Sequence, residues 1–267
     1  MVLSALLVWA GISFPKVKEN AGEKFKSGAF SSSFGTLHYK AAGEKSCPVF
    51  LMIHGSPGSW KAMRVFLEDS ELTSRFRVVA IDRPGYGKSF LAQDEKNSLK
   101  SQLRLIGAFT DSLQNGKPFY LLGHSYGGAL AVGLLAEKNY MSGAVLVAPT
   151  LSPEIQKKRF YNYFAAALKP VMPKEFKKSN EEMWVLSDEL KKVEPQLRQI
   201  NAPVRLIHGK KDWLVPYRTV QYCEERIPGE CLQVITVPKG GHFILWEQHQ
   251  LVAEEMMSLA EEEQKKL

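Results

Sequence analysis

Cysteine is scarce in this chain of 267 residues, and no cysteine sits in a metal-binding arrangement. Cys47, Cys223 and Cys231 form no CxxC pair and lack the spacing of zinc ligands, so the sequence predicts no metal site. We interpret all three as free thiols. The alternative, a Cys223–Cys231 disulfide, applies to an exported protein whose geometry permits the bond.

Long apolar runs are also missing. No run reaches the roughly 18 residues that a membrane-spanning helix needs, which excludes a protein with several membrane spans. Residues 2–14 are mostly apolar, but no Lys or Arg precedes them, and Lys16 and Lys18 follow. We treat residues 1–24 as an extension that is either a leader or anchor or a surface helix. A cytoplasmic location is favoured, and membrane association is expected only through this segment.

Positive charge is in excess but is not clustered. The chain has 35 Lys and Arg against 28 Asp and Glu, a formal net charge of +7. Both signs mix in residues 152–200 and in the C-terminal tail, which is typical of solvated helix faces. Phosphate binding along a nucleic acid needs clustered positive charge, so we predict no nucleic-acid partner.

Short apolar runs do recur along the chain. They are Val49–Ile53, Val78–Ile81, Phe119–Leu122, Ala144–Val147, Val204–Ile207 and Leu232–Val237. Unbroken runs of this length are typical of strands covered on both faces, as in a parallel sheet. Before them, Phe30–Ala42 predicts an antiparallel hairpin at the sheet edge, turning at Phe34-Gly35.

Amphipathic segments of helical length separate these runs. They are Trp60–Leu67, Ser98–Leu113, Gly127–Lys138, Pro216–Ile227 and Gln248–Ala260. Alternating strands and helices predict a doubly wound α/β sheet. Residues 151–200 contain no strand-like run and are rich in aromatic side chains. We therefore predict a core of residues 25–150 and 201–267, with residues 151–200 inserted as a helical lid.

The strongest local motif is Gly123-His124-Ser125-Tyr126-Gly127-Gly128. It follows a predicted strand and opens a predicted helix, which is the context that a G-x-S-x-G nucleophile requires. Glycines let neighbouring backbone approach the sharp turn, and the helix N-terminus stabilises negative charge beside the serine. We predict that Ser125 is a nucleophile; the alternative is an ordinary helix N-cap.

A serine nucleophile needs a base and an acid that orients the base. Asp212 and His242 both follow predicted strands, so they lie at the sheet edge that carries Ser125. Taken singly, Asp212 is better explained as an N-cap and His242 as a surface residue, but three residues in the order Ser, acid, His at one sheet edge favour catalysis. For the oxyanion we expect the backbone N–H groups of Tyr126 and Ser56.

Two other motifs are assigned structural roles. His54 ends a strand before a glycine turn, and we expect it to be structural. Residues 82–89, DRPGYGKS, end like a phosphate-binding loop, but Asp82 stands where that loop needs glycine, and Pro84 lacks an N–H donor. We predict no nucleotide site and expect Asp82 to hold its loop by hydrogen bonds.

Together, the motifs resemble those of the α/β-hydrolase family over roughly residues 25–260. The matching segments are His54–Gly58, Asp82–Ser89, Gly123–Gly128, Gly209–Pro216 and Gly241-His242. The resemblance implies a mostly parallel eight-stranded sheet, a helical lid, a Ser125–Asp212–His242 triad and no cofactor. Dehalogenase and epoxide-hydrolase relatives carry Asp at the nucleophile, so Ser125 argues against those activities.

The sequence thus predicts a serine hydrolase that cleaves a small, uncharged, partly apolar ester through an acyl-enzyme. The alternatives are a C–C bond, amide or lactone hydrolase of the same fold, and a receptor-like protein that binds a small ligand without turnover. The only partner expected is this small molecule. The residues expected to line its pocket are Phe160, Phe164, Trp184, Leu214 and Phe243.

Overall fold

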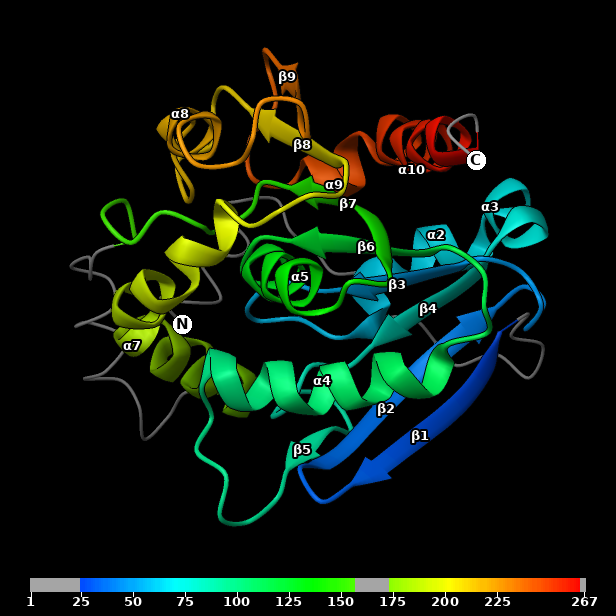
Figure 1. Ribbon diagram of the computed structural model, residues 1–267. Helices are drawn as coiled ribbons and strands as arrows, with labels where there is room; N and C mark the ends of the chain where they lie inside the picture. The colour runs from blue at the N-terminus through cyan, green and yellow to red at the C-terminus, as the bar shows by residue number, and fades with distance from the viewer. Residues whose placement is uncertain (1–24, 157–172, 265–267) are drawn as a thin grey trace.

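The computed structural model describes residues 25–156 and 173–264. Its strands are β1 (Lys26–Ser32), β2 (Gly35–Ala42), β3 (Val49–Ile53), β4 (Arg77–Ile81), β5 (Phe90–Leu91), β6 (Phe119–His124), β7 (Met141–Val147), β8 (Val204–Gly209) and β9 (Leu232–Val237). They form one sheet in the order β1-β2-β4-β3-β6-β7-β8-β9, and β5 pairs with β2 beside this path (Figure 1). The extension of residues 1–24 lies outside the described residues.

The strand directions confirm the mostly parallel sheet. The predicted hairpin is β1 and β2, which pair antiparallel on either side of the turn before Gly35. Strand β2 is also antiparallel to β4 and β5, whereas every pairing from β4 through β9 is parallel. The two-residue strand β5 was not predicted, because two residues are too few to produce a periodic pattern.

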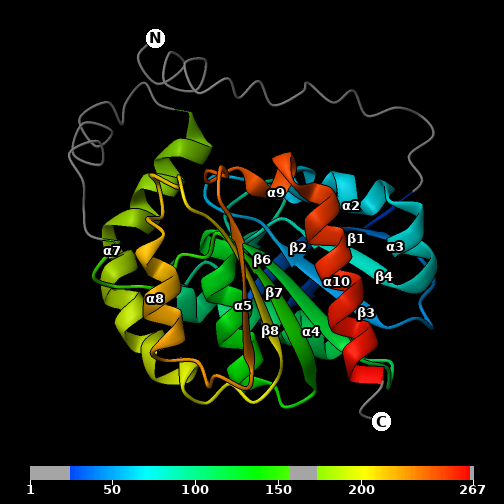
Figure 2. The same cartoon turned by 90° about the horizontal axis from the view of Figure 1, so that it is seen from above.

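Helices cover both faces of the sheet. They are η1 (Trp60–Met63, a 3-10 turn), α2 (Arg64–Glu68), α3 (Ser70–Arg75), α4 (Leu99–Leu113), α5 (Tyr126–Glu137), α7 (Lys174–Leu197), α8 (Arg218–Glu224), α9 (Ile244–Glu247) and α10 (His249–Gln264). Helices α4, α5 and α8 lie on one face, and α2, α3 and α10 on the other (Figure 2). The doubly wound arrangement is therefore confirmed.

The two apolar cores explain the unbroken apolar strands. In β3, Leu51 and Ile53 pack toward α4 and α5, while Phe50 and Met52 pack toward α2 and α10. Successive side chains of a strand point to opposite faces, so a strand covered on both sides must be apolar at every position. All five residues of β3 are buried.

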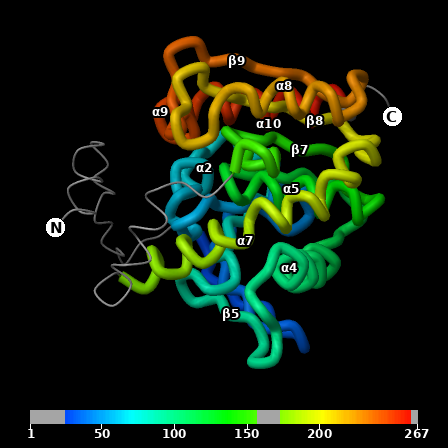
Figure 3. The backbone as a smooth tube through the Cα atoms, turned by 90° about the vertical axis from the view of Figure 1, so that its left-hand side faces the viewer, coloured from blue at the N-terminus to red at the C-terminus, as the bar shows by residue number. Residues whose placement is uncertain are grey.

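Helix α7 forms most of the described part of the predicted insertion and lies between β7 and β8 in the chain. Its buried side chains Leu186, Leu190 and Leu197 join the core that α4 and α5 form. In Figure 3 the helix passes between α5 and α4, and it packs mainly against α5. Among the described residues, no helix has the length and apolar character needed to cross a membrane.

Candidate active site

Ser125 occupies a strained turn between β6 and α5. Its backbone has φ +52° and ψ −118°, a conformation that L-residues rarely adopt. Glycine is needed beside it, because a Cβ on Gly127 would lie 2.1 Å from the carbonyl oxygen of Ile53. The Ser125 N–H donates to the Val147 carbonyl over 3.0 Å, which ties the turn to the end of β7. The hydroxyl is thereby held at the N-terminus of α5.

The structure brings Ser125, His242 and Asp212 together in a hydrogen-bonded Ser–His–Asp series. The Oγ of Ser125 lies 3.1 Å from Nε2 of His242, and Nδ1 of His242 lies 2.7 Å from Oδ2 of Asp212. A carboxylate only accepts hydrogen bonds, so Nδ1 carries the proton and Nε2 accepts from the serine. Asp212 follows β8 and His242 follows β9, at the sheet edge where we expected them.

Backbone donors hold the other oxygen of Asp212. Its Oδ1 accepts from the N–H groups of Leu214, at 2.9 Å, and Val215, at 2.7 Å. The ring of His208 donates from Nε2 to the Val215 carbonyl over 2.9 Å and supports the same loop. Burial lowers the pKa of His208, so this ring stays neutral beside the carboxylate. Asp212 therefore presents Oδ2 to His242 in one orientation.

A second histidine holds the loop of His242. His124 donates from Nε2 to the backbone carbonyl of His242 over 3.2 Å, and its ring packs against those of His242 and Trp246. Burial, and to a lesser extent the nearby His242, lowers the pKa of His124 to about 3. A neutral His124 ring adds no charge next to the imidazole of His242.

The expected oxyanion donors, Ser56 and Tyr126, come from two segments that meet near Ser125. Tyr126 is the first residue of α5, and Ser56 lies in the loop after β3. The Gly55 backbone in that loop closely approaches Ser125, since a Cβ on Gly55 would lie 3.1 Å from the Ser125 Cβ. Thr150 also adjoins Ser125, with its Oγ1 3.4 Å from the Ser125 Oγ.

His54 uses both ring nitrogens within the structure. Its Nδ1 donates to the Gly55 carbonyl over 2.7 Å, and its Nε2 accepts from the Arg83 N–H over 2.9 Å. Burial and then the Arg83 charge hold the pKa of His54 well below its usual value. These contacts match the structural role expected for this histidine.

Asp82 holds its loop as predicted. Its carboxylate accepts from the backbone N–H groups of Trp60, at 2.9 Å, and Lys88, at 3.1 Å. Gly87 has φ +52°, and a Cβ there would lie 2.1 Å from the Asp82 carboxylate. The close approach of backbone and carboxylate explains the glycine of this motif, and the expected hydrogen bonds are confirmed.

Of the expected pocket residues, Phe160 and Phe164 lie outside the described residues. Trp184 is half-buried on α7, and Leu214 is half-buried next to Asp212. Phe243 is half-buried, with its ring centroid 5.8 Å from that of His242. Leu214 and Phe243 therefore adjoin the Ser–His–Asp series.

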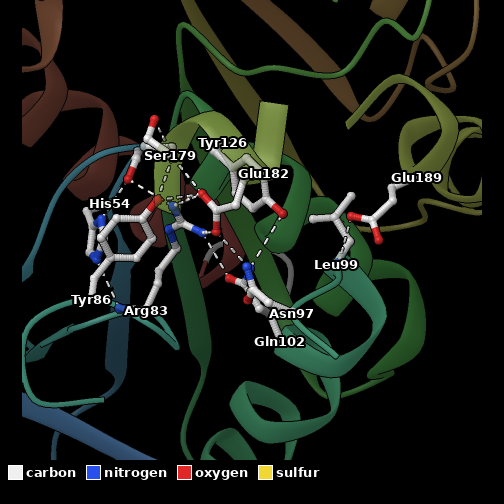
Figure 4. A network of polar contacts seen from close by, with 12 residues as sticks. His54, Arg83, Tyr86, Asn97, Leu99, Gln102, Tyr126, Ser179, Glu182 and Glu189 are labelled. Atoms are coloured by element: carbon white, nitrogen blue, oxygen red, sulfur yellow. Dashed lines mark hydrogen bonds and ion pairs between the residues drawn. The ribbon is translucent and has the colours of Figure 1, made fainter. Parts of the chain in front are cut away.

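Sequence reasoning missed a buried ion pair next to this series (Figure 4). The Glu182 side chain is 1% exposed and pairs with Arg83, which is fully buried. The mixed charges of residues 152–200 indicated solvated helix faces, and Glu182 departs from that expectation. A signal was present: Glu182 precedes Leu186 and Leu190 at intervals of four, on the apolar stripe of α7.

A Ser–His–Asp series at a strand-to-helix turn of a mostly parallel sheet is the arrangement of α/β hydrolases. The sequence pattern described as "Alpha/beta hydrolase family" matches residues 50–255. The chain therefore belongs to the alpha/beta hydrolase family.

One curated relative is similar to this chain over part of its length. Epoxide hydrolase 4 of Mus musculus is 41% identical over 96 residues, which are 36% of this chain and 26% of that protein. The match thus spans about a quarter of this curated relative.

Solved structures share the fold over most of both chains. The esterase RhEst1 from Rhodococcus sp. ECU1013 superposes with a TM-score of 0.64 at 20% identity, covering 89% of this chain and 98% of that one. The haloalkane dehalogenase DatA from Agrobacterium tumefaciens C58 gives 0.69 at 17% identity, covering 90% and 98%. At these identities the likeness shows the fold alone.

Proposed function

We propose that this protein is a serine hydrolase that cleaves a small, uncharged, partly apolar carboxylic ester through an acyl-enzyme. The observation that carries the proposal is the hydrogen-bonded series from Ser125 through His242 to Asp212. A serine hydroxyl is a weak nucleophile until a base takes its proton, and His242 is within hydrogen-bond distance to do so. Asp212 orients the imidazole and stabilises its charged form.

In the first half-reaction, the Ser125 Oγ attacks the carbonyl carbon of the ester while its proton passes to Nε2 of His242. The tetrahedral intermediate collapses when His242 returns that proton to the leaving oxygen, and the alcohol departs. In the second, water attacks the acyl-enzyme and gives a proton to His242. The carboxylic acid is released when that proton returns to Ser125.

Negative charge on the carbonyl oxygen is stabilised by two backbone N–H groups, those of Ser56 and Tyr126. The N-terminus of α5 adds a favourable dipole at the same place. Such pre-oriented donors contribute strongly, since losing one typically costs about 10²–10³ in kcat.

Two features support an ester over the substrates of the epoxide hydrolases and the dehalogenase among the relatives. Residue 125 is a serine, whereas the family resemblance implies Asp at the nucleophile position of epoxide hydrolases and dehalogenases. The half-buried apolar side chains of Leu214 and Phe243 beside the series suit an uncharged acyl group. C–C bond, amide and lactone hydrolysis use the same residues and are the alternatives to test beside the ester.

The test is turnover of 4-nitrophenyl esters of increasing acyl chain length by the full chain, with Ser125→Ala as the control. We expect wild type to release nitrophenolate and Ser125→Ala to lose that activity with its fold unchanged by circular dichroism. Equal turnover by wild type and Ser125→Ala would refute the assignment of Ser125 as the nucleophile. Tight binding of the esters without turnover would support the receptor-like alternative.

A further inference from the structure

Glu182 on α7 and Arg83, in the loop after β4, form a pair sealed from solvent (Figure 4). Arg83 donates from Nη1 to Oε1 over 3.0 Å and from Nη2 to Oε2 over 3.1 Å, in two parallel hydrogen bonds. Burial opposes the charge on Glu182, but Arg83 and the hydrogen bonds to the carboxylate outweigh it, so the pKa of Glu182 lies below its usual value. Both groups are therefore charged in the folded protein.

Arg83 also contacts the backbone of the expected oxyanion hole. Its Nη2 donates to the Gly55 carbonyl over 3.1 Å, next to the bond from His54. That carbonyl belongs to the same peptide unit as the Ser56 N–H. A trans peptide is planar, with its C=O and N–H pointing in opposite directions. Because the Gly55 oxygen points toward Arg83, the Ser56 N–H points away from Arg83.

The same carboxylate holds the Ser56 side chain. The Ser56 hydroxyl donates to Oε2 of Glu182 over 2.5 Å, and the Tyr86 hydroxyl donates to this oxygen over 2.7 Å. Ser56 is thus attached to Glu182 in two ways, directly through its hydroxyl and indirectly through Arg83 and the preceding carbonyl. The Ser56 N–H lies between the two attached groups, the Gly55 carbonyl and the Ser56 side chain.

The other donor is linked to the pair as well. The Arg83 guanidinium lies 4.2 Å from the ring centroid of Tyr126. Gln102 donates to Oε1 of Glu182 over 3.0 Å, and the same amide nitrogen lies 3.5 Å from the Tyr126 hydroxyl oxygen. One carboxylate from α7 is therefore connected to both residues whose N–H groups would bind the oxyanion.

We propose that Glu182, acting through Arg83 and Ser56, is a positioning residue that makes the oxyanion hole depend on the seating of helix α7. This inference rests on the proposed function, because it assigns Ser56 and Tyr126 the role of oxyanion donors. Helix α7 belongs to the insertion between β7 and β8, whereas both donors belong to the core. The pair thus makes the donors' geometry respond to how the insertion packs.

Substitutions at Ser56 and Glu182 break the link, and one at Glu189 serves as a matched control. Ser56→Ala removes the hydroxyl contact but keeps the backbone N–H, and Ser56→Thr restores a hydroxyl. Glu182→Gln removes the charge that holds Arg83. For the control, Glu189→Gln alters a second contact between α7 and the core, in which Glu189 accepts from the Leu99 N–H over 2.9 Å in a hydrogen bond that involves neither Ser56 nor Tyr126.

The measurements are steady-state kinetics on a 4-nitrophenyl ester and inhibition by an alkyl trifluoromethyl ketone and its methyl ketone counterpart. The trifluoromethyl ketone adds to a serine nucleophile and places an oxyanion in the hole, whereas the methyl ketone binds mainly as the neutral ketone. We expect kcat to fall about 10-fold in Ser56→Ala and about 10²-fold in Glu182→Gln, with KM nearly unchanged, since a misplaced donor costs no more than a lost one.

Trifluoromethyl ketone affinity should fall in parallel with kcat, while methyl ketone affinity stays constant. Ser56→Thr should recover most of the loss, and Glu189→Gln should behave as wild type. Equal losses for the two ketones, or an effect of Glu189→Gln as large as that of Glu182→Gln, would show a general structural role and overturn the proposal. Should Glu182→Gln fail to fold, Ser56→Ala and Ser56→Thr decide alone.

Amide hydrogen exchange at Ser56 separates this proposal from the proposed function. If wild type hydrolyses no ester, the proposed function fails. Faster exchange at Ser56 in Glu182→Gln but not in Glu189→Gln would still support the positioning of this N–H by α7. Unchanged exchange in both variants would refute the positioning whatever the turnover.

Discussion

Replacing Asp212 with Asn is the sharpest single test of the Ser–His–Asp series. The carboxylate accepts the Leu214 and Val215 N–H groups on Oδ1 and the His242 ring on Oδ2. An amide has only one oxygen. If that oxygen keeps the two backbone donors, the NH₂ group faces Nδ1 of His242 and forces the ring proton onto Nε2. The imidazole then cannot accept the proton of Ser125.

The alternative orientation of the amide is also costly. Turning its oxygen toward His242 would point the NH₂ group at two backbone N–H groups and leave both without an acceptor. Each buried unsatisfied group costs about 1–3 kcal/mol, so this flip costs roughly 2–6 kcal/mol. A loss of turnover of about 10⁴-fold, the size that a wrong tautomer produces, corresponds to about 5.5 kcal/mol. Either orientation of the amide in Asp212→Asn therefore lowers ester turnover, by about 30-fold at the smallest flip cost and by up to about 10⁴-fold where the wrong tautomer dominates.

The assay is kcat/KM for a 4-nitrophenyl ester, with thermal unfolding followed in parallel. Asp82→Asn is the control, because Asp82 is a second buried aspartate that accepts backbone hydrogen bonds but lies outside the series. We expect this variant to lose stability and to keep most of its turnover where it is folded. Turnover above about 5% of wild type in Asp212→Asn would refute the tautomer argument, because even a flip that costs only about 2 kcal/mol leaves about 3% of the activity. A greater loss in folded Asp82→Asn would show that the acid is misassigned.

The remaining predictions concern His242, His124 and Trp184. His242→Ala should reduce turnover by at least about 10²–10⁴-fold, and residual activity above a tenth of wild type would contradict its role as the base. The free energy of unfolding of the wild type should fall between about pH 7 and about pH 5. In His124→Gln this fall should be smaller by about 2 kcal/mol, measured by denaturant titration at each pH. The reason is that the pKa of His124 is about 3 in the folded protein, below its value in the unfolded chain. The neutral ring therefore stabilises the fold at pH values above the unfolded pKa, and this contribution is lost as the pH falls. Parallel pH profiles of wild type and variant would contradict this. Trp184→Ala should shift the preferred acyl chain length in the ester series, and an unchanged profile would remove Trp184 from the pocket.

Local patterns in the sequence were enough to predict the sheet and the place of Ser125 at a strand-to-helix turn. Strands such as β3 are apolar at every position because helices cover both faces, and this pattern is visible without coordinates. Ser125 was recognisable because the strained turn requires glycines at fixed spacings around it. Asp212 and His242 could be placed at the same edge because parallel strands bring their carboxyl ends together.

Short elements and boundaries depended on packing. The two residues of β5 form a strand because the pairing of β2 with β4 begins only at Tyr39 and leaves Gly35 and Thr36 open to pair with β5. Trp60–Leu67, predicted as one helix, divides into η1 and α2. Local propensity is weak over so few residues, and the surrounding core decides between a 3-10 turn and an α-helix.

The partner of Glu182 was beyond the reach of any local pattern. The apolar stripe of α7 marks Glu182 as a residue facing the core, and a buried carboxylate must find a positive partner. That partner, Arg83, lies 99 residues earlier in the chain, in a motif that sequence reasoning assigned only to its own loop. Motif spacing describes neighbours along one segment. Only the tertiary structure brings α7 against the loops after β3 and β4, and so decides which of the chain's many charges leave water together.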